Sequence, residues 1–174
     1  MTHSLVEQLR FTRSEFMRAV KGISDEDARK RLLPMNCISW NIGHLAWQEQ
    51  RYFIYLGQGK IILPDINKNF ATGAPGSTPP LKEMLSAWRT ITATADPWLD
   101  TLTPAKLQQN AIKEGQPIPY FYGNLLQRVI YHYWYHIGEN LAIRQKLGHK
   151  RLPQFVGDID HKAPYRPENR ARKK

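Results

Sequence analysis

Two histidines, His132 and His136, lie four residues apart in a segment with helical periodicity. On an α-helix this spacing places both imidazoles on one face, with their Cβ atoms about 6 Å apart. Two rings placed in this way can bind one divalent metal ion, each at about 2.1 Å. Histidine pairs at this spacing also occur in ordinary packing or face solvent, so the pair needs support from its surroundings.

The residues around this pair form one helical stripe that is apolar at both ends and polar in the middle. A stripe that faces a core normally stays apolar, because buried polar groups without partners cost free energy. The two imidazoles and the carboxylate in its centre therefore need partners, which either a metal ion or a buried hydrogen-bond network would supply. The stripe advances in steps of three and four residues through Leu125, Val129, His132, His136, Glu139, Ile143 and Leu147.

A third ligand has to come from another helix, and His44 is the candidate. It lies between Trp40 and Trp47 in an apolar segment with helical character. Gly43 beside it would allow a neighbouring helix or a ligand to approach closely. The alternative is a lone core histidine bonded to a carbonyl oxygen. The other histidines stand in terminal or loop settings and are expected at the surface: His3, His149 and His161.

Four long apolar patterns predict the helices that would carry these residues. The first begins at Ser4, with Glu7 three residues later as a capping box. The third begins after a Thr78 cap and contains Pro97, a site of kinking or interruption. The second and the fourth end at glycines, as helices often do. The expected ranges are 4–20, about 39–56, 81–102 and about 124–147.

Two connections between these helices are long. The connection over residues 58–80 is expected to be irregular, as a functional loop or an overhand crossover. The connection over residues 109–122 could form a small edge hairpin around Glu114 and Gly115, whereas its prolines argue against a central strand. The expected fold class is all-α: a four-helix bundle with a long crossover between the second and third helices.

Composition sets further limits on the class of protein. Apolar residues make up 41% of the chain and charged residues 23%, which is ordinary for a soluble globular protein. The sequence has no apolar run near the ~20 residues of a membrane span and no signal-peptide core at its start, so a cytoplasmic location is expected. The single Cys37 excludes a disulfide framework and a cysteine zinc cage, and we expect it to be a small buried side chain.

The net charge of +10 could attract nucleic acid or other anions. Five of the basic residues lie between Arg166 and Lys174. That stretch has no interleaved aromatic residues to stack on bases, and such tails are usually solvated. We therefore expect one bundle domain over residues 1–157 and a basic tail over residues 158–174, with a nucleic-acid accessory role as the least favoured interpretation.

The segment from Ser39 to Leu45, together with His132-Tyr-Trp-Tyr-His136-Ile-Gly138, resembles the DinB-like (YfiT-type) superfamily. The resemblance covers nearly the whole chain, from the first predicted helix to about Gly157. It implies a four-helix bundle, often dimeric, with a long crossover between the second and third helices. It also implies that one histidine of the second helix and two of the fourth bind nickel, zinc or iron. Carried over residue by residue, the ligands are His44, His132 and His136.

The second-helix segment is also similar to the N-terminal domain of ergothioneine-type sulfoxide synthases, which carry a His-x3-His-x-Glu motif. This chain has Gly138 where that glutamate would stand, with Glu139 one residue later. It also has no room for the second catalytic domain of those enzymes. Sulfoxide synthesis is therefore not expected here.

Three neutral imidazoles leave at least one coordination position open, which is typical of catalytic rather than structural sites. An ion held there lowers the pKa of a bound water or thiol. The resemblance implies a metal-dependent enzyme with a small-molecule substrate: a thiol S-transferase acting with bacillithiol, mycothiol or glutathione, or a hydrolase. A homodimer is also expected. The alternative is a non-catalytic metal-binding bundle, a sensor or a sequestering protein with a coordinatively closed site.

Helical spacing also suggests supporting residues. Gln48 and Arg51 lie four and seven residues beyond His44, so both are expected to line the same cavity. Arg51 could hold a carboxylate bidentately, or it could form a surface salt bridge. Glu139 or Asn140 could orient a ligand imidazole. Four aromatic residues are expected in the core or at an interface rather than in catalysis: Tyr52, Tyr133, Trp134 and Tyr135.

Overall fold

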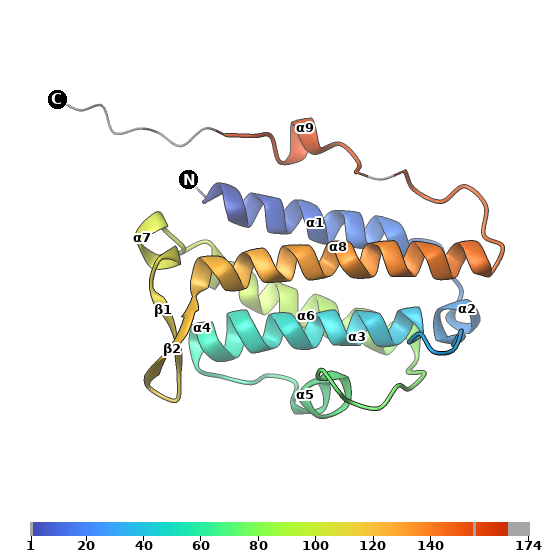
Figure 1. The fold of residues 1–174 in the computed structure, drawn as a ribbon, viewed down its shortest axis with the longest axis horizontal. Helices are drawn as coiled ribbons and strands as arrows, with labels where there is room; N and C mark the ends of the chain where they lie inside the picture. Colours follow the sequence, from blue (N-terminus) through green and yellow to red (C-terminus); the bar gives the residue numbers. More distant parts are fainter. Residues whose placement is uncertain (1, 155, 167–174) are drawn as a thin grey trace.

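The computed structural model describes residues 2–154 and 156–166 and consists mainly of four long helices that lie side by side (Figure 1). This confirms the predicted all-α bundle with a small hairpin. Within the described ranges, none of the helices combines the length and the apolar composition that a bilayer crossing requires. The elements are α1 (Ser4–Val20), α2 (Asp25–Arg29), α3 (Ile38–Glu49), η1 (Gln50–Tyr55), α4 (Leu56–Gln58), α5 (Pro64–Phe70), α6 (Leu81–Leu99), α7 (Pro104–Leu107), β1 (Asn110–Lys113), β2 (Gln116–Phe121), α8 (Tyr122–Lys146) and α9 (Ile159–Lys162).

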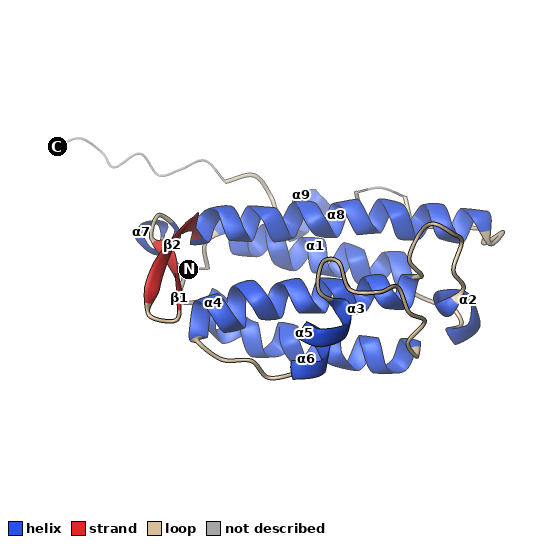
Figure 2. Ribbon diagram, turned by 60° about the horizontal axis from the view of Figure 1, so that its bottom comes forward, coloured by secondary structure: helices blue, strands red, loops and turns tan. Residues whose placement is uncertain are grey.

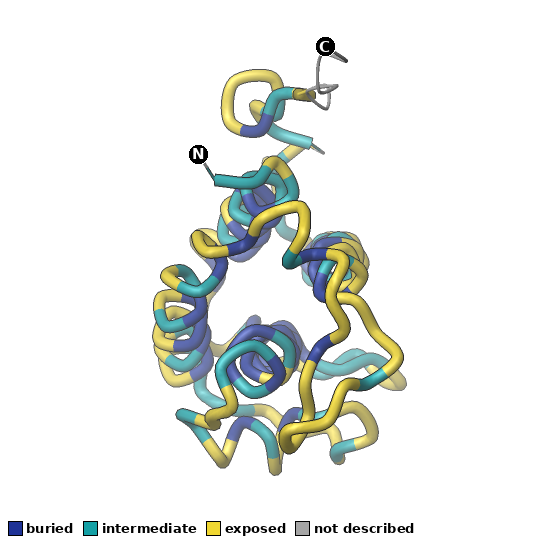
Figure 3. Tube along the Cα trace, turned by 90° about the vertical axis from the view of Figure 1, so that its left-hand side faces the viewer, coloured by how far each residue is buried: buried dark blue, intermediate teal, exposed yellow. Residues whose placement is uncertain are grey.

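The core lies between the four long helices, which turn their buried faces toward one another (Figure 3). Helix α1 packs mainly against α8, and α3 packs mainly against α6. The apolar side chains at three- and four-residue spacing face inward, because burying them removes apolar surface from water. Large side chains that are fully buried include Phe16, Ile42, Leu45, Ile91, Leu99, Leu126, Tyr133 and Ile143.

The second long helix runs without a break through α3, η1 and α4, but its middle section is π-helical. At the start of that section, the fully buried Gln50 ties the helix to the crossover that follows. Its amide nitrogen donates to the Leu63 carbonyl oxygen at 2.9 Å and to Asn67 Oδ1 at 3.0 Å. The helix ends at Gly59, whose φ of 72° is left-handed, as predicted for a terminating glycine.

The crossover between the second and third long helices is partly helical, so the prediction of an irregular connection is wrong for its first half. Helix α5 begins with Pro64, which suits the first position of a helix. It packs against α3 (Figure 2) and buries Ile66 and Phe70. A Cβ on Gly43 would lie 2.7 Å from the Phe70 ring and 2.8 Å from Met84 Sδ. Gly43 therefore permits the predicted close approach of neighbouring elements, which are α5 through Phe70 and α6 through Met84.

The start of α6 differs from the prediction, because Thr78 does not cap it. The N-cap position is Pro80, which offers no side-chain acceptor. The backbone N–H of Leu81 instead donates to Asp25 Oδ1 on α2 at 2.8 Å. Pro97 lies in the last turn of α6 and does not interrupt the helix. The cap thus comes from a distant part of the sequence, which local spacing does not reveal.

A two-stranded antiparallel hairpin precedes the fourth long helix, as predicted. Its turn consists of Glu114 and Gly115, with φ values of 53° and 79°, and two left-handed residues are what a tight type I′ turn requires. Ile112 pairs with Pro117 across the strands. Strand β2 leads directly into α8, so the hairpin lies at the end of the bundle near α4 (Figure 1).

After α8 the chain runs back along α1 (Figure 1). Within residues 158–166, α9 lies against α1, and Gln8 Nε2 donates to the Ala163 carbonyl oxygen at 2.8 Å. The first part of the predicted tail therefore has contacts with the bundle. Residues 167–174, which contain most of the basic run, lie outside the described residues.

Candidate metal centre

Three histidines converge between α3 and α8 in the middle of the bundle. Their candidate ligand atoms all lie within 4.8 Å of one another. The ring of His44 stands at 85° to His132 and at 77° to His136. Among the described residues, no other group of three or more histidine, cysteine or acidic side chains is placed to hold an ion. The structure thus brings together the same three histidines that the sequence singled out: His44, His132 and His136.

The position of His136 is set by a carboxylate on the next turn of α8. His136 Nδ1 lies 2.7 Å from Glu139 Oε2, and Asn41 Nδ2 of α3 donates to the same carboxylate oxygen at 2.9 Å. A carboxylate acceptor favours the tautomer that carries its proton on Nδ1, so Nε2 keeps a free electron pair. Asn41 also donates to Asn140 Oδ1 at 2.9 Å. Glu139, rather than Asn140, is therefore the residue that orients the imidazole.

The ring of His44 is held by the crossover and by two indoles. His44 Nδ1 lies 2.7 Å from the Phe70 carbonyl oxygen at the end of α5. The ring stacks on Trp40 with a centroid distance of 4.9 Å and on Trp47 with one of 5.2 Å. A carbonyl can only accept, so His44 carries its proton on Nδ1 and its Nε2 is an acceptor. Among the described residues, no donor bonds to that Nε2.

His132 completes the cluster with its Nε2 3.0 Å from the Nε2 of His136. Two nitrogens that each lie about 2.1 Å from a shared ion are themselves roughly 3 to 3.4 Å apart. The Nδ1 of His132 is buried and has no hydrogen-bond partner among the described residues. Burial, together with His136 and His44, lowers the pKa of His132 to about 3. His132 is therefore neutral near pH 7, which is the form that binds a metal.

These observations favour an ion over a buried hydrogen-bond network. A network without an ion would need donors for the inward-facing nitrogens, yet His44 Nε2 has none within the described part of the chain. Burial lowers the pKa of His44 by more than its bond to the Phe70 carbonyl raises it, so a protonated ring does not supply the missing donor at neutral pH. The three side chains fit a divalent cation better than they fit one another.

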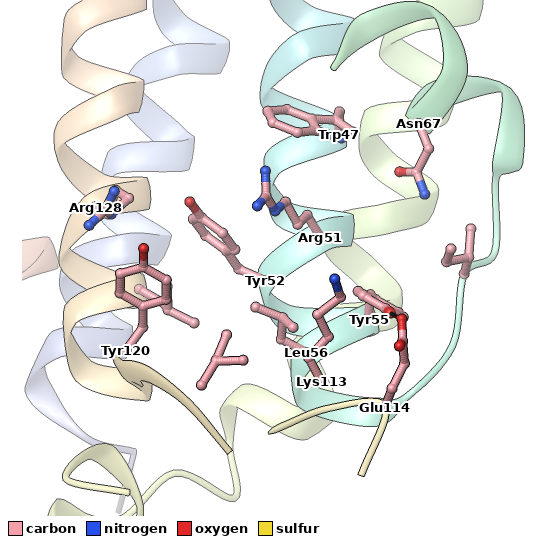
Figure 4. A pocket seen from close by; sticks show the side chains of 13 residues that line it. Trp47, Arg51, Tyr52, Tyr55, Leu56, Asn67, Lys113, Glu114, Tyr120 and Arg128 are labelled. Atoms are coloured by element: carbon pink, nitrogen blue, oxygen red, sulfur yellow. Dashed lines mark hydrogen bonds between the residues drawn. The ribbon is translucent and has the colours of Figure 1, made fainter. Parts of the chain in front are cut away.

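A pocket of about 630 Å³ opens between η1, the hairpin and the first turns of α8 (Figure 4). Trp47 links it to the cluster, because this indole both stacks on His44 and lines the pocket. Arg51 lines it from η1 and Arg128 lines it from α8, but none of the three histidines is among the residues of its wall, so a cavity shared by Arg51 and His44 stays a prediction. Gln48 is buried, with its Oε1 unpartnered among the described residues, but it is not among the residues of the pocket wall.

The aromatic residues near the site have different environments. Tyr133 is fully buried in the core, as expected, whereas Tyr135 is exposed. Tyr52 is half-buried and packs against the core, as expected, and it also lines the pocket. Trp134 is half-buried, and its ring lies 6.3 Å from that of Phe11 on α1.

A buried polar network, which no local sequence pattern indicates, joins all four long helices. Arg13 Nε of α1 donates to Glu49 Oε1 of α3 at 2.8 Å. Tyr133 OH of α8 donates to the same oxygen at 2.6 Å and accepts from Trp88 Nε1 of α6 at the same distance. Burial acts to lower the pKa of Arg13, but Glu49 outweighs it and the net pKa is raised. Each of these side chains has partners, so the network is structural.

The remaining histidines stay away from the cluster. His161 is 86% exposed at its side chain, as expected. His3 is the N-cap of α1, with Nδ1 accepting a hydrogen bond from the first turn, so the predicted capping box at Ser4 is wrong by one residue. His149 is partly buried and lies 3.2 Å from Asp27 on α2, so its assignment to the surface is wrong.

Cys37 is fully buried at the start of α3, as predicted. Its Sγ lies 3.3 Å from both Ser39 Oγ and the Ser77 carbonyl oxygen. The Cys37 side chain is therefore surrounded by protein atoms, and it takes no part in the histidine cluster.

The family model of the DinB superfamily matches residues 8–139 of the chain. The matched range runs from α1 into α8 and includes all three histidines of the cluster and the glutamate that contacts His136. No curated protein matches the chain. The matched range thus contains the residues that the structure places around the candidate metal centre.

Proposed function

The chain belongs to the DinB superfamily, and we propose that it is a metal-dependent enzyme that binds one divalent ion on His44, His132 and His136. The convergence of the three ligand atoms within 4.8 Å carries this proposal. The outer nitrogens of His44 and His136 already have acceptors, Phe70 and Glu139, so both imidazoles are oriented before an ion arrives. A set of imidazole ligands suits zinc, nickel or iron.

The proposed reaction is transfer of a low-molecular-weight thiol to an electrophile, with hydrolysis as the variant. When bound, a divalent ion of this kind lowers the pKa of a coordinated thiol or water and so supplies a nucleophile near neutral pH. The chain itself holds the ligands and limits access of water, since Trp40 and Trp47 cover both faces of His44. The substrate would enter through the pocket that Trp47 shares with the cluster.

A role in metal storage or sensing without catalysis is less well supported. A sequestering site should be coordinatively closed, but the described residues place only three ligands in the group. A pocket of about 630 Å³ beside the cluster also has a size typical of small-molecule sites. Both features favour an open site with a substrate.

Elemental analysis of gently purified, untagged protein tests the proposal. We expect close to one equivalent of zinc, nickel or iron per chain in the wild type and loss of it in His132→Ala/His136→Ala. His161→Ala, which removes an exposed histidine, is the matched control and should retain the metal. The ion identified then goes into thiol-transfer and hydrolysis assays. A wild type that arrives without metal and takes up none of the three ions would refute the proposal.

A further inference from the structure

The pocket beside the cluster is positively charged (Figure 4). Arg51 of η1, Arg128 of α8 and Lys113 of β1 line it. Glu114 is the one acidic side chain that the described part of the chain contributes to its wall, and its Oε1 accepts a hydrogen bond from Tyr55 OH at 3.0 Å. Three positive charges thus face one negative charge in a space of small-molecule size. Such a pocket attracts an anion.

The two pocket arginines have no acidic partner. Among the described residues, no carboxylate lies within ion-pair distance of Arg51 or Arg128, whereas Arg10, Arg13 and Arg18 each pair with one. A guanidinium without a carboxylate partner keeps its charge and its N–H donors available for a ligand.

Aromatic rings hold both guanidinium groups in place. The Arg51 guanidinium carbon lies 5.5 Å from the centre of the Trp47 ring and 5.7 Å from that of Tyr52. The Arg128 carbon lies 5.7 Å from the centre of the Tyr120 ring. Contact with a ring face positions a guanidinium but does not occupy its in-plane donors. Both groups are therefore preorganised to bind the oxygens of a planar anion.

The arginines also lie at a suitable distance from the cluster. Arg128 precedes His132 by four residues on α8, which is just over one turn or roughly 6 Å along the helix. On the opposite wall, Arg51 lies over Trp47, and Trp47 lies over His44. The three histidines are not among the residues that line the pocket, so Trp47 is the side chain that separates the arginines from the cluster on this wall.

From these contacts we infer that the substrate is a carboxylate-bearing small molecule. Its carboxylate binds between Arg51 and Arg128, and its reacting group lies at the histidine cluster. The inference rests on the proposed function, since it names the substrate class of the same site. In Figure 4 the two arginines approach from opposite walls, with Tyr52 between them.

Two thiols that differ only in a carboxylate provide the test. Calorimetry measures binding of N-acetylcysteine and N-acetylcysteamine to the zinc-loaded full chain. Bidentate, charge-assisted hydrogen bonds to a carboxylate increase affinity by about ten- to a hundredfold. We therefore expect N-acetylcysteine to bind about ten- to a hundredfold more tightly than N-acetylcysteamine. Arg51→Gln/Arg128→Gln should reduce the ratio to within about threefold. Lys60→Gln/Lys146→Gln removes the same charge at exposed positions outside the pocket and should keep the ratio.

Equal affinities in a wild type that holds zinc would overturn the inference and leave the metal site standing. A wild type that takes up none of zinc, nickel and iron would instead refute the proposed function. In that case, or if neither thiol binds, the affinities of 3-phenylpropionate and 3-phenylpropanamide are compared instead. These two compounds contain no thiol and differ in having a carboxylate or a neutral amide, so they test whether the arginine pair binds a carboxylate. A preference for the carboxylate that disappears in Arg51→Gln/Arg128→Gln then supports the carboxylate site, and no preference contradicts it. Circular dichroism verifies that both double variants are folded.

Discussion

The Nδ1 atom of His44 lies 2.7 Å from the carbonyl oxygen of Phe70, the last residue of α5. The crossover between the second and third long helices thus holds one of the three histidines of the candidate metal centre. The ring of Phe70 packs against Gly43. The position of α5 and the orientation of the His44 ring are therefore coupled through Phe70.

Replacing Gly43 with alanine tests this coupling. The added Cβ would lie 2.7 Å from the Phe70 ring and 2.8 Å from Met84 Sδ, so α5 or α6 has to move. Overpacking of this kind costs about 1–3 kcal/mol, which corresponds to a fall of roughly 3–10 °C in the melting temperature for a chain of this size. Because Phe70 also orients His44, zinc affinity should fall about tenfold. Thermal melting and chelator competition measure the two effects.

Gly138→Ala is the matched control for that substitution. Gly138 is exposed within α8, and a Cβ there would meet no atom within 4 Å. Alanine favours a helix by roughly 0.5–1 kcal/mol over glycine, so this variant should melt at a slightly higher temperature with unchanged zinc affinity. If the two glycine variants behaved alike, the close packing around Gly43 would have no functional consequence.

Glu139 is expected to control metal affinity without binding the ion. It accepts from His136 Nδ1 at 2.7 Å and from Asn41 Nδ2 at 2.9 Å. Loss of such an acceptor typically weakens metal binding by about ten- to a hundredfold, so Glu139→Ala should lose affinity in that range in a chelator competition. Glu139→Gln keeps a neutral hydrogen-bond acceptor and should therefore lose less metal affinity than Glu139→Ala. Glu83→Ala, at an exposed position of α6, should bind the metal as tightly as the wild type does. An equal loss of metal affinity in this variant would indicate a general effect of charge.

The Arg13–Glu49 pair is expected to dominate the stability of the bundle. Both side chains are buried, with exposed fractions of 6% and 0%. Removing Glu49 leaves the buried Arg13 with only the partly exposed Asp96 as an ion-pair partner among the described residues, so Glu49→Leu should lower the free energy of unfolding by about 3–5 kcal/mol. Arg13→Met/Glu49→Leu removes both charges and should cost clearly less than the single change. Chemical denaturation measures both variants, and a double variant at least as unstable as Glu49→Leu would contradict this account.

The long helices and the histidine cluster could be predicted because their signals are local. His132 and His136 lie on one helix at a spacing that fixes their relative position, and the stripe around them shows which face is inward. His44 needed the resemblance as well as its apolar surroundings. The π-helical turn at Gln50 and the helix α5 gave no comparable signal, since both depend on packing between distant segments.

Features that join several elements could not be predicted from spacing. The Arg13–Glu49–Tyr133 network takes one member from each of three helices, and no local pattern relates them. Arg51 was identified from its distance to His44, but Arg128 and Lys113 reach the same pocket from α8 and from the hairpin. Only the three-dimensional arrangement shows that these cations share one space.

Glu15 should make the stability of the protein depend on acid pH. It contacts Arg18, and its Oε2 accepts from the Gly157 backbone N–H at 2.9 Å. Burial acts to raise the pKa of Glu15, but the bonds from Arg18 and Gly157 outweigh it, so the net pKa lies below its usual range. A carboxylate with a lower pKa in the folded state stabilises that state above its unfolded pKa of about 4.3. That stabilisation is lost as the pH falls through the folded pKa.

Glu15→Gln should therefore melt below the wild type at pH 7, and the difference should shrink as the pH falls through the folded pKa of Glu15, because the wild-type side chain then becomes neutral as well. Glu26→Gln, at an exposed position of α2, controls for the loss of one negative charge and should show a smaller difference. Melting curves of the three proteins between pH 7 and pH 3 provide the measurement. A difference between Glu15→Gln and the wild type that stays constant over this range would mean that the ionised form of Glu15 has no special role. The segment after α8 would then be held to α1 by its other contacts, such as that between Gln8 and Ala163.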